Sequence, residues 1–320
     1  DVVMLAAEDG APSWLSADVW YPTQVESPQN ERFSVILYAP GWDGTRNDNR
    51  HLYALLASRG YVVVTFDDVG ADQVAERSYL RDVDQAAFDP PSLSSEAKAS
   101  AFRKAATVRL SLMVRKARAV LAALAASSRK LAHAGVSRPL DLERVGMIGF
   151  SFGGSVAAEM PNQDQRFVAI ANMDGWLFGA AAKSGVPTAY MAFNSDYPEA
   201  EMRARTGSSE QRRTAQWVLA DRAYHRRQLR QPSAYVIFFD RVGHTDFTDA
   251  LFEPSLMSYI KFWRRTQQQR YQLRASLDAF ILGFFDRHLR GRPSAGEIFA
   301  KAPEYTAVRV LVSGAAAQQH

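Results

Sequence analysis

The sequence predicts an α/β fold in which a mostly parallel β-sheet is flanked by helices. Three observations support this fold class and its organisation as one domain. The 320 residues have ordinary globular composition, with 47% hydrophobic and 22% charged residues. Short apolar runs alternate with longer helical patterns, which is typical of a parallel sheet covered by helices. The chain shows no internal repeat or low-complexity segment, so we expect residues 1–320 to form a single domain.

Six apolar runs predict the parallel strands. They have the length of strands rather than of helices, and most are rich in β-branched or aromatic residues. Residues Ser16–Tyr21 and their neighbours predict additional antiparallel strands at an edge. The six runs are Ser34–Ala39, Tyr61–Phe66, Arg144–Gly149, Phe167–Met173, Thr188–Phe193 and Ala234–Phe239.

Helical patterns fill most of the intervals between these runs. The clearest has apolar residues at steps of three and four from Phe102 to Leu124, which keeps one face of the predicted helix apolar. The polar stretch Val69–Ala97 contains two consecutive prolines and predicts a loop or excursion. The predicted helices are His51–Gly60, Ala97–Ala126, Ser151–Glu159, Glu210–Arg230 and Leu277–Leu289.

Composition and charge exclude several classes of protein. Cysteine is absent, so the chain has no disulfide, thiolate nucleophile or cysteine-ligated zinc. No apolar run approaches the roughly 18 to 20 residues that span a bilayer. The formal net charge is +4 and the basic residues are scattered along the chain. A nucleic-acid binder would concentrate them on one face or tail, so we expect no nucleic-acid partner.

The first residue is Asp1 rather than methionine. A removed secretory signal would account for this start, and so would trimming during expression. We therefore expect a secreted or periplasmic protein, with a cytoplasmic location as the alternative.

The segment Gly149-Phe-Ser151-Phe-Gly153 matches the pattern G-x-S-x-G. It directly follows an apolar strand and directly precedes a helix rich in small residues. A serine at such a turn is held in a strained backbone with its hydroxyl exposed, which is typical of a catalytic nucleophile. The alternatives are a glycine-rich helix start and a phosphate-binding loop. The second is disfavoured because no lysine follows the glycines.

A serine nucleophile requires a base, and His244 is the best candidate among six histidines. It follows the last predicted core strand, within a turn that leads into another helix. The order serine, acid, histidine along the chain requires a histidine at this place. The other histidines lie upstream of the serine, within helical patterns or at the chain end: His51, His133, His225, His288 and His320.

Two aspartates qualify as the acid that orients His244. Asp174 and Asp196 both end apolar strands between the serine and the histidine. The later strand is the more usual place, which favours Asp196. The residues around Asp174 are more apolar, which would strengthen a carboxylate–imidazole bond. The residues alone leave both open.

An oxyanion hole requires two backbone N–H donors. One would come from Phe152, directly after the serine, and the other from the loop that follows the first core strand. In that loop Gly41 allows the backbone to turn inward and Trp42 is placed to present its amide.

Four segments together resemble the plasma-type platelet-activating-factor acetylhydrolases and their bacterial relatives. These segments are residues 141–154 (DLERVGMIGFSFGG), 172–176 (NMDGW), 194–197 (NSDY) and 243–247 (GHTDF). The family comprises serine lipases and esterases of the α/β-hydrolase fold, close to dienelactone hydrolases, and the resemblance extends from about Val35 to Leu289. It implies that the acid is the first residue of the D-x-W segment, Asp174. One departure is that Pro40-Gly41 stands where the family usually has His-Gly.

We therefore expect a serine esterase or lipase that works through an acyl-enzyme, without metal or organic cofactor. Its substrate would be a small-molecule or lipid ester, including short-acyl or oxidised phospholipids. A cutinase-like polyester hydrolase and an amide-cleaving or acyl-transfer enzyme are the alternatives within this fold. A non-catalytic binding protein is the alternative from another class. His244 and Asp246 are too few to form a metal site.

The segment Phe247–Trp263 is crowded with large apolar residues directly after His244. It predicts a wall or lid beside the catalytic mouth. An exposed apolar patch there would favour peripheral contact with a lipid surface. The alternative is that these side chains only pack a terminal helix onto the sheet.

Overall fold

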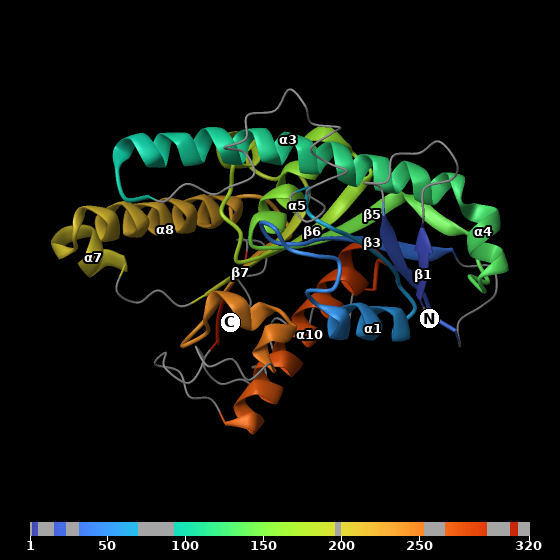
Figure 1. Cartoon of the computed structure of the whole chain (residues 1–320). Coiled ribbons are helices and arrows are strands. Elements are labelled where there is room, and N and C mark those ends of the chain that lie inside the picture. Colours follow the sequence, from blue (N-terminus) through green and yellow to red (C-terminus); the bar gives the residue numbers. More distant parts are fainter. Residues whose placement is uncertain are drawn as a thin grey trace.

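A mixed β-sheet forms the centre of the computed structural model (Figure 1), which describes residues 2–5, 16–23, 32–69, 93–195, 200–252, 266–292 and 308–312. Its strand order is β1-β2-β4-β3-β5-β6-β7-β8-β9. The strands from β4 to β8 in this order run parallel, while β1, β2 and β9 pair antiparallel at the two edges. The strands are β1 (Val2–Leu5), β2 (Ala17–Trp20), β3 (Phe33–Ala39), β4 (Val62–Phe66), β5 (Leu140–Phe150), β6 (Phe167–Met173), β7 (Ala189–Asn194), β8 (Ala234–Phe239) and β9 (Val308–Val312).

Helices cover both faces of the sheet. In Figure 1, α3, α5 and α8 lie on one side and α1 and α10 on the other. The α-helices are α1 (Arg50–Ser58), α3 (Glu96–Ala126), α4 (Ser128–His133), α5 (Phe152–Gln163), α6 (Gly179–Ser184), α7 (Ala200–Thr206), α8 (Ser209–Gln228) and α10 (Gln267–His288). Two short 3₁₀ helices, η3 (His244–Phe247) and η4 (Asp249–Leu251), follow β8. In the part of the chain that the structure describes, none of the helices has the length and apolar character of a membrane span.

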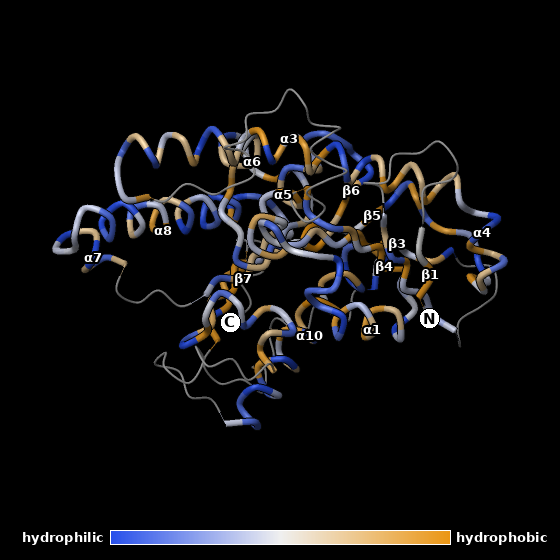
Figure 2. Tube along the Cα trace, in the orientation of Figure 1, coloured by the Kyte–Doolittle hydropathy of each residue, from blue (hydrophilic) through white to orange (hydrophobic). Residues whose placement is uncertain are grey.

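The alternation of side chains along β3 explains why both faces are covered. Val35 and Leu37 belong to a core cluster with apolar residues of α3 and α5. Ile36 and Tyr38 belong to a second cluster with residues of α1 and α10. Successive side chains of a strand point to opposite faces, so a strand that is apolar throughout requires a helix layer on each side. Figure 2 shows hydrophobic residues along the central strands and hydrophilic ones on much of α8.

The predicted α/β class is confirmed, and the bounds of β6 and β8 are those predicted. The predicted start of the last helix at Leu277 is wrong, because α10 begins at Gln267. Its first turns are polar and carry no apolar stripe, but Thr266 and Gln269 form a capping box that starts the helix there. The edge strand β9 is absent from the prediction because its residues are partly exposed and lack the buried character of the core strands.

The prediction of a lid at 247–263 is only partly covered by the structure. Phe247 and Leu251 are buried in the cluster that packs against α10, as the alternative interpretation expected for them. Residues 253–263 lie outside the described residues, and so does most of the predicted excursion at 69–97. The wall or lid, the excursion and the single domain over 1–320 stay predictions.

Candidate active site

The register of the sheet brings Ser151 and Asp174 to the same edge. Phe150 at the end of β5 pairs with Met173 at the end of β6, so the next residue of each strand is a neighbour of the other. The Ser151 N–H donates to the Met173 carbonyl at 2.8 Å. The Asp174 N–H donates to the carbonyl of Phe193 in β7 at 2.9 Å. The carboxyl ends of parallel strands are where α/β proteins place their ligands.

Ser151 occupies the tight turn between β5 and α5. Its φ of 53° and ψ of −122° lie in a region that non-glycine residues rarely adopt. A Cβ atom at Gly149 would lie 1.9 Å from the Gly153 oxygen, and one at Gly153 would lie 2.1 Å from the Ala39 oxygen. The glycines of the G-x-S-x-G pattern are therefore required by close backbone packing. The structure confirms the predicted strand, turn and helix.

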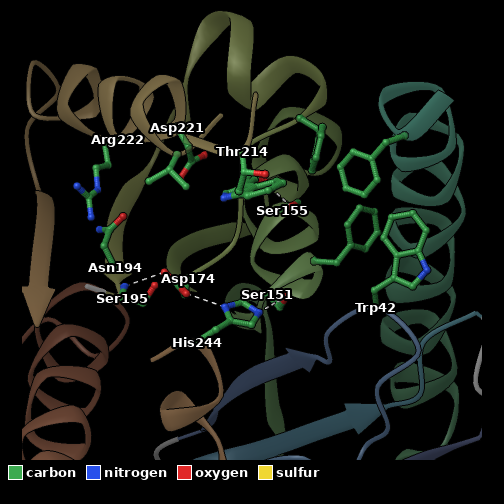
Figure 3. Close-up of a pocket in the computed structure, with 15 residues that line it drawn as sticks. Trp42, Ser151, Ser155, Asp174, Asn194, Ser195, Thr214, Asp221, Arg222 and His244 are labelled. Carbon is green, nitrogen blue, oxygen red and sulfur yellow. Dashed lines mark hydrogen bonds and ion pairs between the residues drawn. The ribbon is translucent and has the colours of Figure 1, made fainter. Parts of the chain in front are cut away.

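His244 lies between the serine and the aspartate (Figure 3). Its Nε2 atom is 2.8 Å from Ser151 Oγ, and its Nδ1 atom is 2.6 Å from Asp174 Oδ2. An ionised carboxylate only accepts, so Nδ1–H donates to Asp174 and Nε2 is left to accept the serine proton. The imidazole packs on the Phe150 ring at 4.9 Å between centroids and is 48% exposed.

Asp174 is held as a carboxylate by two donors. Its Oδ1 accepts the Ser195 N–H at 2.8 Å, and its Oδ2 faces His244. Burial raises the pKa of the Asp174 carboxyl, but the hydrogen bonds and charge of His244 and the Ser195 donor outweigh it and the pKa lies below its ordinary value. Asp196, the competing candidate, lies outside the described residues. The catalytic role of Asp174 is therefore a proposal that rests on its contact with His244.

A buried chain of hydrogen bonds holds the turn after Asp174. The Asn172 side chain accepts the Gly175 N–H at 2.8 Å and donates to the Gly175 carbonyl at 2.9 Å. It also donates to the Tyr190 hydroxyl at 3.0 Å, which contacts His225 Nδ1 at 3.0 Å. His225 Nε2 lies 2.9 Å from Asp221. Asp221 is itself buried, and its carboxylate also accepts the Leu177 N–H at 2.9 Å.

The loop after β3 approaches the serine from the other side. A Cβ atom at Gly41 would lie 3.3 Å from Ser151 Cβ, so a larger residue there would crowd the nucleophile. The rings of Trp42 and Phe152 meet at 4.9 Å between centroids. Phe152 is the first residue of α5, and the first N–H groups of a helix have no acceptor within it. The assignment of the Trp42 and Phe152 amides as oxyanion donors stays a prediction.

Arg109 of α3 holds this loop from inside the protein. Its guanidinium is fully buried, contacts the buried carboxylate of Asp68 and reaches Asp43 at 2.6 Å. The Asp43 N–H donates to Asp68 at 2.7 Å. Arg109 Cζ also stands 4.4 Å from the centroid of the Trp42 ring. The sequence pattern contains no signal for this network, because its members lie far apart along the chain.

We expect Arg109→Met to lower the free energy of unfolding by about 3 to 5 kcal/mol, because it leaves Asp68 buried without its cation. Urea denaturation measures this. Arg166→Met is the matched control, because Arg166 is 38% exposed in its ion pair with Asp164 and should contribute about 0 to 1 kcal/mol. Equal losses in the two variants would contradict a special role for the buried cation.

A cavity of about 370 Å³ opens at the three residues. Its wall is mainly apolar and aromatic, with polar side chains such as Asn194, Thr214 and Arg222 on the side away from Trp42 (Figure 3). Among the described residues no group of three or more histidines and acids could hold a metal ion. The absence of a metal and of a cofactor stays a prediction about the reaction.

Comparison with known proteins gives a family and a fold. Residues 22–186 match the model of the dienelactone hydrolase family. The structure is similar to that of a ferulic acid esterase from Streptomyces cinnamoneus, with a TM-score of 0.60 and 17% sequence identity. The match covers 97% of this chain and 95% of that chain. The predicted α/β-hydrolase fold is confirmed. A search of curated proteins found no match, and the resemblance to the platelet-activating-factor acetylhydrolases stays a prediction.

Proposed function

Because the chain belongs to the dienelactone hydrolase family, we propose that it is a serine hydrolase that cleaves carboxylic esters through Ser151, His244 and Asp174. The observation that carries the proposal is the pair of contacts on one imidazole, 2.8 Å to the serine Oγ and 2.6 Å to the aspartate Oδ2. A nucleophile, a base and an orienting acid in this order are what serine catalysis requires.

The first half of the reaction transfers the acyl group to the enzyme. Ser151 Oγ attacks the ester carbonyl while His244 Nε2 takes its proton. Asp174 holds the tautomer in which Nε2 is free to accept, and it stabilises the imidazolium that forms. The amides of Trp42 and Phe152 would stabilise the tetrahedral oxyanion, a donor effect of about 3 to 4 kcal/mol each.

Acylation ends when His244 gives its proton to the alcohol and the bond between the acyl carbon and the alcohol oxygen breaks. In the second half a water attacks the acyl carbon with His244 as base, and His244 then returns that proton to Ser151 Oγ as the carboxylic acid leaves. The 48% exposure of the His244 side chain leaves room for both the alcohol and the water. No step of this scheme uses a metal or an organic cofactor.

The size of the cavity favours a substrate with a small acyl group. Its volume of about 370 Å³ is near the lower end of the range of about 300 to 1,000 Å³ for ligand pockets. This favours a small soluble ester, or a phospholipid with a short or oxidised acyl chain bound at a lipid surface, as the resemblance to the acetylhydrolases implies. A polyester hydrolase and an amide-cleaving or acyl-transfer enzyme remain the alternatives in the same fold.

Labelling by a fluorophosphonate probe tests the proposal against a non-catalytic binding protein. We expect the folded protein to react stoichiometrically at Ser151, to hydrolyse p-nitrophenyl acetate, and to do both in the presence of EDTA. Heat-denatured protein is the control, because an unactivated serine does not react. A folded protein that takes up no probe and cleaves no ester would contradict the enzyme assignment.

A further inference from the structure

Six aromatic side chains gather on the Trp42 side of the cavity, and we call them the aromatic cluster. Neighbouring rings lie between 4.9 and 6.2 Å apart, mostly in tilted or edge-to-face arrangements. They come from the loop after β3, from α3, α5 and α8, and from the segment between β6 and α6. The members are Trp42, Phe102, Phe152, Trp176, Phe178 and Trp217.

The aromatic cluster forms a wall of the cavity at the margin of the core, since all members except Trp217 line the cavity. Phe152 is buried in the core, Trp42 and Phe178 pack against the core, and the members other than Phe152 are partly exposed. Partly exposed aromatic residues that converge on one pocket are a feature of binding sites for apolar ligands. The faces and edges of these rings offer an aromatic ligand the offset and edge-to-face contacts that aromatic pairs prefer.

Neighbouring residues hold these rings in place. Arg109 stands over Trp42 at 4.4 Å and Arg103 stands over Trp217 at 5.5 Å. The Ser155 hydroxyl donates to the backbone carbonyl of Trp176, which fixes the backbone that carries this ring. Side chains that are already ordered lose little entropy when a ligand binds, so a preformed slot favours a rigid, flat partner over a flexible chain.

The position of the cluster relative to Ser151 indicates which half of the ester it would hold. Trp42 and Phe152, whose rings meet in the cluster, are the proposed oxyanion donors, whereas the His244 imidazole lies against Phe150. The leaving alcohol must depart next to His244 Nε2, which protonates it. The group on the other side of the carbonyl carbon therefore extends toward the aromatic cluster.

On these grounds we propose that the cavity is an acyl pocket that selects esters of acids carrying a single aromatic ring. The proposal rests on the proposed function, since it identifies the acyl half of the substrate of that same site. The cavity volume of about 370 Å³ suits one ring on a short linker better than a long fatty acyl chain.

Two pairs of esters test this proposal. Methyl 3-phenylpropanoate and methyl 3-cyclohexylpropanoate differ only in the ring of the acyl half. We expect kcat/KM to be about fivefold higher for the phenyl ester, which is within the range of one aromatic contact. Benzyl acetate and cyclohexylmethyl acetate carry the same difference in the alcohol half, and we expect their kcat/KM values to be about equal. Equal rates for the first pair, or a preference confined to the second pair, would overturn the proposal.

Phe102→Leu tests whether the aromatic cluster causes the preference for the phenyl ester. Phe102 contacts four other members from α3, so its loss should bring the phenyl-to-cyclohexyl ratio close to one. Tyr271→Leu is the matched control, because Tyr271 is an aromatic residue that is 57% exposed and does not line this cavity. It should keep the wild-type ratio. An unchanged ratio in Phe102→Leu would count against the cluster as the selecting surface.

Binding to Ser151→Ala separates this proposal from the proposed function. Calorimetry with 3-phenylpropanoate and 3-cyclohexylpropanoate compares the two acids without any chemical step, and we expect the phenyl acid to bind about fivefold more tightly. Equal binding, or binding of neither acid, would overturn the pocket assignment. Failure of every ester and of the fluorophosphonate probe, with the phenyl preference in binding retained, would instead overturn the hydrolase assignment alone.

Discussion

Ser151→Ala is expected to abolish ester hydrolysis while the melting temperature stays close to that of the wild type. Loss of the serine from such a triad lowers kcat by about a millionfold. The fold should not change, because alanine keeps the Cβ atom, so the φ of 53° is no more strained than before. The hydrogen bond between Ser151 and His244 involves an exposed imidazole, so its removal costs about 0.5 to 1.5 kcal/mol at most.

The measurement is turnover of p-nitrophenyl acetate together with thermal unfolding of each variant. Ser155→Ala is the matched control, since Ser155 lines the same cavity one turn further along α5 and its hydroxyl donates to the Trp176 carbonyl, whereas the Ser151 hydroxyl contacts His244. It should lose less than a factor of about ten, the loss that corresponds to one hydrogen bond. Wild-type turnover in Ser151→Ala would contradict the assignment of the nucleophile.

The sequence predicted Ser151 and His244 because both depend on local pattern and chain order. The strand, the turn glycines and the small residues of α5 are contiguous, and only one histidine follows the last parallel strand within a turn. The acid was ambiguous because Asp174 and Asp196 both follow apolar runs. The pairing of Phe150 with Met173 brings Asp174 beside the serine, and this pairing depends on sheet register, which a single sequence does not display.

The features that the sequence did not predict depend on contacts between distant segments. Arg109 and Asp68 are 41 residues apart, and each alone has the pattern of a solvated residue. His225 and Asp221 are close in sequence, but their burial follows from how α8 packs on the sheet. The aromatic cluster likewise brings Phe102 of α3 into contact with Trp217 of α8. The sequence of neither helix indicates how the two helices are placed relative to each other.

Asp174→Asn is expected to lower kcat by about four powers of ten with little loss of stability. An asparagine amide presented to Nδ1 makes that atom an acceptor, so the proton moves to Nε2 and the base can no longer take the serine proton. The backbone should be unaffected, because asparagine tolerates the φ of 59° at this position and its oxygen can still accept the Ser195 N–H at 2.8 Å.

Two further variants make the result specific to Asp174. Asp196→Asn replaces the competing candidate, and Asp164→Asn removes a carboxylate that pairs with Arg166 away from the cavity. Both should keep most of the activity, because neither change alters the tautomer of His244. The discriminating quantity is kcat for p-nitrophenyl acetate at neutral pH, where the lowered pKa of Asp174 keeps its carboxylate ionised. A loss of four powers of ten in Asp196→Asn, with Asp174→Asn active, would transfer the role of the acid to the later strand.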